Sequence, residues 1–456
     1  MTSESARRPT LFRGGRVLSM GPARDFVGDV RVEGGRITAL GWDVSAEGAE
    51  VIDCRGKLVI PGLVQPHVHL CQTLFRGRAD GLLLLDWLEQ KIWPFEAAHD
   101  PETLAASARL GIAELLRSGT TCILDMGTVH HTEVIFEAAA EMGIRANIGK
   151  ALMDTGERVP AGLMDTTDGA LEESCALADR WHGAEDGRLM ASFAPRFVLS
   201  CTDALLRDVV AEARQRGLLL HSHASENPGE VEAVRAIYGK DNLLVLAELG
   251  MVGPDVVLAH GVWLSEAERA ILQSSRTHLV HCPSSNLKLG SGVARVPELL
   301  ARGISVALAA DGAPCNNTLD GFQEMRLAGL LHAPRAGVAS MPPRRVLELA
   351  TLDGARAMGL EREIGSLELG KRADVVVVDA DGLHAAPAED PYSMLVYSLG
   401  ARDVRHVMVD GRLVVSDHEL RVADEAELVE TARAAVKQIE RRLDAGEKPA
   451  PVRAAG

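Results

Sequence analysis

Short hydrophobic runs alternate with amphipathic stretches from residue 58 to about residue 360 of the chain. Eight runs have the length and apolar character of buried strands: Leu58–Val64, Thr120–Met126, Ala146–Leu152, Leu189–Ala194, Leu218–His223, Val256–His260, Thr277–His281 and Ser305–Ala310. The stretches between them, such as Pro101–Ser118 and Asp203–Arg216, repeat apolar residues at helical spacing. Eight strands alternating with helices predict an α/β fold, a closed (β/α)8 barrel of the TIM type.

Both ends of the chain have a different pattern, in which short apolar runs are separated by glycine turns such as Gly14-Gly15 and Gly34-Gly35. We expect residues 1–57 and 361–456 to form one small discontinuous β-sandwich domain built from both chain ends. The C-terminal part would end in a helix near Thr431–Leu443. The catalytic barrel would then occupy residues 58–360.

Polar side chains of the metal-binding type stand at the ends of four predicted strands. They are His67 and His69, His223, His260 and Asp311. In a parallel barrel the C-terminal strand ends lie side by side, so these groups can converge. Residues at i and i+2 share one strand face, which lets both histidines of the first strand point inward. Histidines with one carboxylate suit Zn²⁺, with Fe²⁺ as the alternative.

Three further residues near these strand ends need separate interpretations. His221 and His223 form a second His-x-His pair, and we assign His223 as the ligand because the strand ends there. His221 is then a core histidine or a donor to a ligand. Glu226, at the start of the following loop, is the expected acid/base. Lys150 ends the third strand, and the sequence leaves it open whether it is a pocket cation or a structural one.

Composition narrows the possible partners. The net charge of −16 argues against a nucleic-acid surface, which requires a basic face. The sequence has no run of about 18 apolar residues, so we expect no membrane span. The N-terminus lacks the apolar stretch of a secretory signal. The seven cysteines are scattered without a Cys-x-x-Cys pair, so we expect reduced thiols in a cytoplasmic enzyme that acts on a small molecule.

The chain resembles the amidohydrolase superfamily, in the branch of cytosine-, guanine- and adenosine-type deaminases and triazine hydrolases. The resemblance rests on PGLVQPHVHL, HSHASEN, VHCPSSNLKLGSG, ADGAPCNN and GSLELGKRADVVVVD. Within the branch, LLDWLEQKIWPFE and FQEMRLAGLL look most like the deaminases of 5′-methylthioadenosine, S-adenosylhomocysteine and 5′-deoxyadenosine. The resemblance supports the five metal ligands and the acid/base Glu226. It also implies that Asp311 takes a proton from the attacking water.

The resemblance assigns further residues to the substrate. It implies that His281 contacts the attacking water or the departing group, that Glu96 contacts ribose hydroxyls, and that Trp87 forms a pocket wall. Arg196 and Phe197 depart from the Pro-His of nucleoside deaminases, because Pro-Arg-Phe is typical of guanine deaminases. Arg196 would face an oxo group or a substrate carboxylate.

Gln72 is similar to guanine deaminases as well, and Asn286 and Lys288 are further pocket candidates. The absence of a lysine at the end of the fourth strand favours one metal ion per subunit over two. The expected activity is therefore hydrolytic deamination of an adenine nucleoside of the 5′-deoxyadenosine, methylthioadenosine or S-adenosylhomocysteine class. The alternatives are deamination of guanine or another oxopurine or pterin, and hydrolysis of a triazine. We expect a homo-oligomer, either a dimer or a tetramer.

Overall fold

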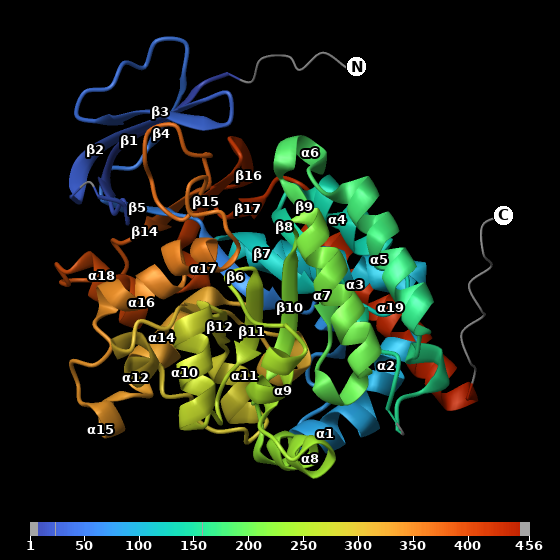
Figure 1. Cartoon of the computed structure of the whole chain (residues 1–456). Coiled ribbons are helices and arrows are strands. Elements are labelled where there is room, and N and C mark those ends of the chain that lie inside the picture. The colour runs from blue at the N-terminus through green and yellow to red at the C-terminus, as the bar shows by residue number, and fades with distance from the viewer. Residues whose placement is uncertain (1–7, 23, 157, 447–456) are drawn as a thin grey trace.

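The computed structural model describes residues 8–22, 24–156 and 158–446. Its centre is a sheet of eight parallel strands in chain order (Figure 1). The strands are β6 Leu63–Val68, β7 Thr120–Met126, β8 Arg145–Leu152, β9 Leu189–Pro195, β10 Leu219–Ala224, β11 Val256–His260, β12 His278–His281 and β13 Val306–Leu308. A parallel bridge between Val68 and Asp311 brings the last strand end beside the first. The predicted barrel is confirmed.

Helices follow the barrel strands and cover the outside of the barrel (Figure 1). The larger ones are α3 Pro101–Arg117, α4 Glu133–Met142, α5 Thr167–Trp181, α7 Asp203–Arg216, α8 Pro228–Tyr238, α9 Asn242–Glu248, α10 Glu266–Ser275, α12 Val296–Ala301, α14 Gly321–Leu330, α16 Pro343–Leu349 and α17 Leu352–Ala357. Shorter turns are η1 Leu70–Phe75, α1 Leu84–Trp87, η2 Leu88–Ile92, α2 Trp93–Ala97, η3 Ala161–Leu163, α6 Ala184–Gly187, η4 Val198–Ser200, α11 Pro283–Lys288, α13 Ala313–Asn316, α15 Ala333–Ala336, α18 Pro391–Ser393, η5 Met394–Ser398 and η6 Ala401–Asp403.

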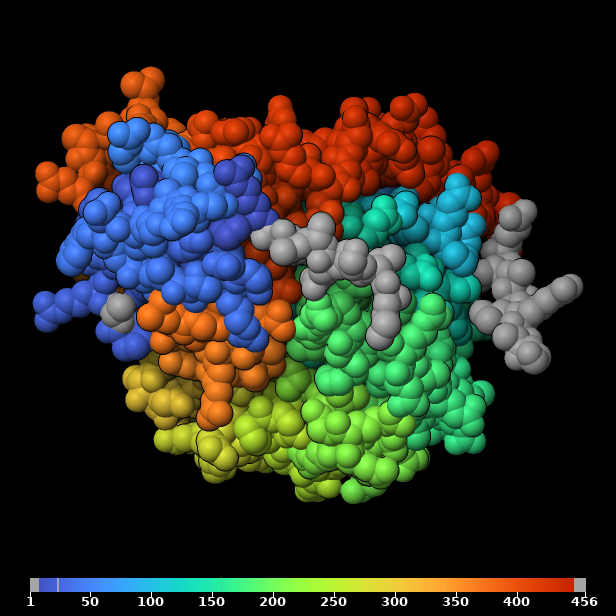
Figure 2. Space-filling model, turned by 90° about the horizontal axis from the view of Figure 1, so that it is seen from above, coloured from blue at the N-terminus to red at the C-terminus, as the bar shows by residue number. Residues whose placement is uncertain are grey.

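Segments from both chain ends form a second sheet, of nine strands, as predicted. They are β1 Thr10–Val17, β2 Phe26–Glu33, β3 Arg36–Gly41, β4 Glu50–Asp53, β5 Lys57–Pro61, β14 Val375–Asp379, β15 Val404–Val409, β16 Arg412–Ser416 and β17 Glu419–Leu420. The antiparallel pair β5–β14 joins the two ends, which Figure 2 shows in blue and orange on one side of the molecule. Phe12, Val30 and Val375 belong to the apolar core of this sheet.

The hydrophobic run 58–64 divides between the two sheets, although its composition predicts one strand. Its first half belongs to β5 and pairs with β14, whereas its second half opens β6 of the barrel. Gly62 lies at the junction, where a Cβ atom would meet the Oγ1 of Thr121 at 2.0 Å. The chain at residue 62 approaches β7 so closely that this position requires a residue without a side chain.

The long helix α19, Glu425–Ala445, packs against the barrel helix α3, although it follows the second sheet in the sequence (Figure 1). The guanidinium of Arg442 donates to the Ala98 carbonyl at 2.9 Å and pairs with Asp100. Within the described residues, no helix combines the length and apolar character that a membrane span requires.

Candidate active site

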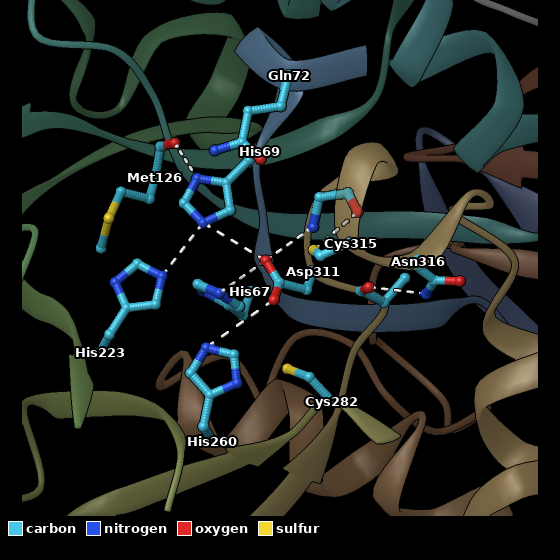
Figure 3. A network of polar contacts seen from close by, with 12 residues as sticks. His67, His69, Gln72, Met126, His223, His260, Cys282, Asp311, Cys315 and Asn316 are labelled. Atoms are coloured by element: carbon cyan, nitrogen blue, oxygen red, sulfur yellow. Dashed lines mark hydrogen bonds and ion pairs between the residues drawn. The ribbon is translucent and has the colours of Figure 1, made fainter. Parts of the chain in front are cut away.

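The five predicted ligand side chains converge at the C-terminal end of the barrel (Figure 3). Asp311 Oδ1 lies 3.3 Å from His67 Nε2 and 3.5 Å from His69 Nε2. Its second oxygen lies 3.9 Å from His260 Nε2, and His223 Nε2 lies 3.2 Å from His69 Nε2. All five residues are buried or nearly so, as expected where barrel strands end beneath their loops.

Hydrogen bonds on the far side of each imidazole set its orientation. His69 Nδ1 donates to the Met126 carbonyl at 3.0 Å, and His223 Nδ1 donates to the Arg196 carbonyl at 2.7 Å. His260 Nδ1 donates to Asn286 Oδ1 at 2.9 Å. Each neutral ring therefore carries its proton on Nδ1 and presents the lone pair of Nε2 to the centre. Such supporting bonds are typical of metal-binding histidines.

The place of His221, which the sequence left open, is behind His67. Its Nε2 lies 2.8 Å from His67 Nδ1, and His67 Nε2 has no hydrogen-bond partner among the described residues. His221 thus contacts the ring of a predicted ligand, and it lies two residues before His223 on β10. Burial lowers the pKa of both His67 and His221, which keeps the rings neutral.

The donor set fits a divalent cation. Neighbouring ligand atoms bound at about 2.0–2.1 Å to one tetrahedral ion lie about 3.3 Å apart. The Nε2 lone pairs of His69 and His223 face each other at 3.2 Å, an arrangement that is repulsive without a positive charge between them. Burial alone would raise the pKa of Asp311, but the histidines around it hold its pKa well below the usual value. The centre is therefore a buried anion surrounded by lone pairs.

The backbone around Asp311 is held by hydrogen bonds on both sides. Asp311 has φ of +66°, a conformation that non-glycine residues rarely adopt and that costs about 1–3 kcal/mol. The side chain of Gln65 accepts from Ala310 N at 2.8 Å, and Asn316 Nδ2 donates to the Ala310 carbonyl at 2.8 Å. Asp311 N donates to the His67 carbonyl at 3.2 Å. These bonds offset the strain and direct the carboxylate toward the histidines.

Glu226 lies beside the ligand cluster, with Oε2 at 3.4 Å from His260 Nε2. Burial, followed by the Asp311 and Glu230 carboxyls, raises the pKa of Glu226 well above its ordinary value. Ser291 Oγ is its single described hydrogen-bond donor, at 3.4 Å. A carboxyl group with a raised pKa is suited to donate a proton to a substrate.

A cavity opens over this cluster. It is lined by His69, Gln72, Leu84, Trp87, Leu88, Arg196, Phe197, His223, Glu226, Glu230, His260, Leu289 and Asp311. Trp87 and Phe197, both expected in the substrate pocket, are among these lining residues. The mixture of apolar walls and a few polar groups in this cavity is typical of small-molecule sites.

Glu96 and Arg196, expected to bind different parts of a substrate, bind each other. Arg196 Nη1 lies 2.5 Å from Glu96 Oε2, and Arg196 Nη2 lies 3.2 Å from Glu96 Oε1. Gln72 Nε2 donates to the same Oε1 at 2.8 Å. All three side chains are buried, and of the three only Gln72 and Arg196 line the cavity. Glu96 thus lies behind the cavity wall.

Other sequence candidates lie elsewhere. His281 is not among the cavity-lining residues, and its ring contacts His332 at 5.6 Å between centroids. Lys150 does not line the cavity, and its Nζ pairs with Asp165 and Glu173 at 3.1 and 2.7 Å. Lys288 pairs with Asp80 at 2.6 Å.

Some residues of the site were missed or misplaced by sequence reasoning. Asn286, taken as a pocket residue, instead orients His260. Leu84 and Leu88 form the apolar wall together with Trp87. Their spacing of i, i+3 and i+4 is a signal for one shared helix face and could have indicated this wall.

Comparisons with known proteins agree with this geometry. A model of the amidohydrolase family matches residues 58–414. A 5′-deoxyadenosine deaminase from Methanosarcina acetivorans is 37% identical over 438 residues, which cover 95% of this chain and 99% of the relative. A 5-methylthioadenosine/S-adenosylhomocysteine deaminase from Desulforudis audaxviator is 39% identical over 420 residues, covering 91% and 95%.

Two solved structures are similar over most of the chain. An adenosine deaminase from Xanthomonas campestris with bound zinc has a TM-score of 0.89 and 33% identity, covering 95% of this chain and 98% of the other. The guanine deaminase of E. coli has a TM-score of 0.80 and 28% identity, covering 90% and 99%. Both similarities extend beyond the barrel into the second sheet.

Proposed function

The chain belongs to the amidohydrolase family, and from this premise we propose that it is a metal-dependent deaminase of an adenine nucleoside. Its substrates belong to the 5′-deoxyadenosine, 5′-methylthioadenosine and S-adenosylhomocysteine class. The reaction is hydrolytic and releases ammonia and the inosine analogue. The observation that carries the proposal is the convergence of four imidazole Nε2 atoms and Asp311 beside the buried carboxyl group of Glu226.

Each of these groups has a defined part in the chemistry. When bound, a divalent cation supplies a nucleophile at neutral pH by lowering the pKa of water. The Asp311 carboxylate accepts a proton from the attacking water. Glu226 donates its proton to the ring nitrogen beside the attacked carbon and so makes that carbon more electrophilic. The proton held by Asp311 passes to the amino group, which leaves as ammonia, and the proton of the new hydroxyl group returns to Glu226 as the carbonyl forms. We retain for His281 the steadying of the oxygen on that carbon as part of the proposal.

Glu96 is proposed to recognise the ribose. Its Oε2 accepts from Arg196 alone among the described residues, so this oxygen has capacity for one hydroxyl donor. Reaching the hydroxyl requires a small movement of the carboxylate toward the cavity. Gln72, Trp87 and Phe197 would surround the purine.

Zinc is the proposed metal, at one ion per subunit, with Fe²⁺ as the alternative. Support comes from the nitrogen-rich donor set and from the zinc in the similar adenosine deaminase. The described residue that follows β9 is Arg196, not a lysine able to bridge a second ion. Metal analysis of the purified protein tests this, and two equivalents per subunit would contradict it.

A guanine or other oxopurine deaminase is the second candidate, and the amide of Gln72 favours it. Because a carboxylate can only accept, the amide group that contacts Glu96 must be Nε2. Oε1 of Gln72 is then a buried acceptor without a described partner. Such an acceptor matches an N–H group on the edge of an oxopurine.

Ammonia release decides between the two candidates. The metal-loaded protein is assayed with 5′-deoxyadenosine, 5′-methylthioadenosine, S-adenosylhomocysteine, adenosine and guanine under identical conditions. The lead proposal expects turnover of the nucleosides and little of guanine. Turnover of guanine alone would replace it with the second candidate, and turnover of a chlorinated or alkylamino triazine alone would indicate triazine hydrolysis.

The cellular setting is part of the same proposal. We propose a cytoplasmic enzyme, because all seven cysteines are free thiols, as is usual in a reducing compartment. A dimer or tetramer is the expected assembly, and light scattering on the purified protein measures it directly.

A further inference from the structure

One part of the cavity wall is apolar. Leu84, Trp87 and Leu88 present one face of the α1–η2 segment to the cavity, and Leu289 and Phe197 complete the wall. Each of these five side chains is less than 9% exposed. A substrate group that contacts this wall is stabilised by the burial of apolar surface. Trp87 Nε1, which has no described partner, is the one hydrogen-bond donor that these five side chains offer.

Charge in the cavity is distributed unevenly. Arg196 is the sole arginine or lysine among the described residues that line it, whereas Glu226, Glu230 and Asp311 are acidic. Both oxygens of Glu230 already accept hydrogen bonds, from backbone N–H groups and from Asn242 Nδ2. The guanidinium of Arg196 is neutralised by the bidentate pair with Glu96. The cavity therefore offers no uncompensated positive side chain to an anionic group.

We propose that this pocket selects adenine nucleosides whose 5′ substituent is uncharged, and that it discriminates against substituents that carry a carboxylate or a phosphate. The inference rests on the proposed function and narrows its substrate class to 5′-deoxyadenosine and 5′-methylthioadenosine. A carboxylate that enters such a cavity loses water without gaining a cation. Glu96 is the specificity-determining residue, because it occupies the one guanidinium that could bind the anion.

Three nucleosides with a 5′-thioether group separate the effect of the substituent's charge from the effect of its length. 5′-Methylthioadenosine is short and neutral, 5′-butylthioadenosine is long and neutral, and S-adenosylhomocysteine is long and carries an ammonium and a carboxylate. We expect kcat/KM for both neutral thioethers to exceed that for S-adenosylhomocysteine by about tenfold or more, the order of one unpaired polar group. Equal or better use of S-adenosylhomocysteine would overturn the inference and leave the proposed function intact. Turnover of no nucleoside at all would overturn both.

The Glu96→Gln variant tests whether Glu96 causes the discrimination against charged 5′ substituents. Loss of the carboxylate frees the guanidinium of Arg196, so the ratio of S-adenosylhomocysteine to 5′-methylthioadenosine turnover should rise about tenfold. Any contribution of Glu96 to ribose binding is common to both substrates and cancels in the ratio. Glu89→Gln is the matched control, because Glu89 lies on η2 but pairs with Arg158, away from the cavity.

Ligand binding provides a readout that does not depend on turnover. S-adenosylhomocysteine should raise the melting temperature of Glu96→Gln more than that of the unmodified protein. An unchanged ratio together with an unchanged thermal shift would refute the role of Glu96. Should Glu96→Gln not fold, the ratios of the three thioethers on the unmodified protein still decide the inference.

Discussion

The buried pair between Arg196 and Glu96 makes a quantitative prediction about stability. The two side chains are 5% and 1% exposed and share two short contacts of 2.5 and 3.2 Å. Replacing Arg196 by Met removes the cation but leaves the carboxylate buried, with Gln72 as its remaining strong donor. Breaking a buried pair from one side costs about 3–5 kcal/mol.

Removing both charges should cost much less. In the double variant Arg196→Met, Glu96→Gln, no ion is left without a partner, and buried pairs can often be replaced by neutral groups at little cost. We expect the double variant to recover at least about 2 kcal/mol relative to Arg196→Met, which is a coupling energy in the range found for contacting residues.

Urea unfolding of the metal-loaded variants at pH 7, compared by midpoint, measures this coupling. The metal concentration must be identical throughout, because a bound ion stabilises the folded state by mass action. A double variant that is less stable than either single variant, by the sum of their losses, would show that the two residues act independently. The role of Glu96 as the neutralising partner of Arg196 would then be wrong.

Four further predictions concern the metal centre and the buried carboxyl groups. Glu226→Gln should lower kcat by about 10²–10⁴-fold with unchanged metal content, as for loss of a general acid; activity within threefold of the unmodified protein would exclude that role. Gln65→Leu removes the acceptor of Ala310 N and should weaken metal affinity by about 10–100-fold in chelator competition, whereas unchanged affinity would mean that Gln65 does not position Asp311. Exhaustive chelation should abolish ammonia release and Zn²⁺ should restore it; activity that survives chelation contradicts the proposed mechanism. Asp125 has its pKa raised by burial to about 7, with one backbone donor opposing this. Because its folded pKa lies above the unfolded value, the protein should lose up to about 4 kcal/mol relative to Asp125→Asn as pH rises from about 4 to about 7. Urea midpoints of both proteins across this range check it, and parallel curves would show that Asp125 is already ionised.

The sequence alone determined the elements of the barrel and the candidate ligands. A buried strand followed by a polar residue is a local pattern, and the parallel barrel brings such strand ends together whatever the loops do. The positions of His67, His69, His223, His260 and Asp311 along the chain were therefore sufficient to predict that they form one cluster.

Pairing between side chains from different strands was decided only by the tertiary structure. His221 and His223 have the same local sequence pattern. Only the structure shows that His221 contacts the ring of His67, a predicted ligand. Glu96 and Arg196 are 100 residues apart, and nothing in either segment indicates that they neutralise each other.

The hydrophobic run 58–64 illustrates the same limit in the backbone. Its composition is uniform, yet its first half pairs with β14 and its second half pairs with β7. Periodicity reports which face of an element is apolar, but the identity of the neighbour depends on how distant segments meet in space. The types of the candidate ligand residues can therefore be predicted from local sequence, whereas the pairing of Glu96 with Arg196 forms only when distant segments of the barrel meet.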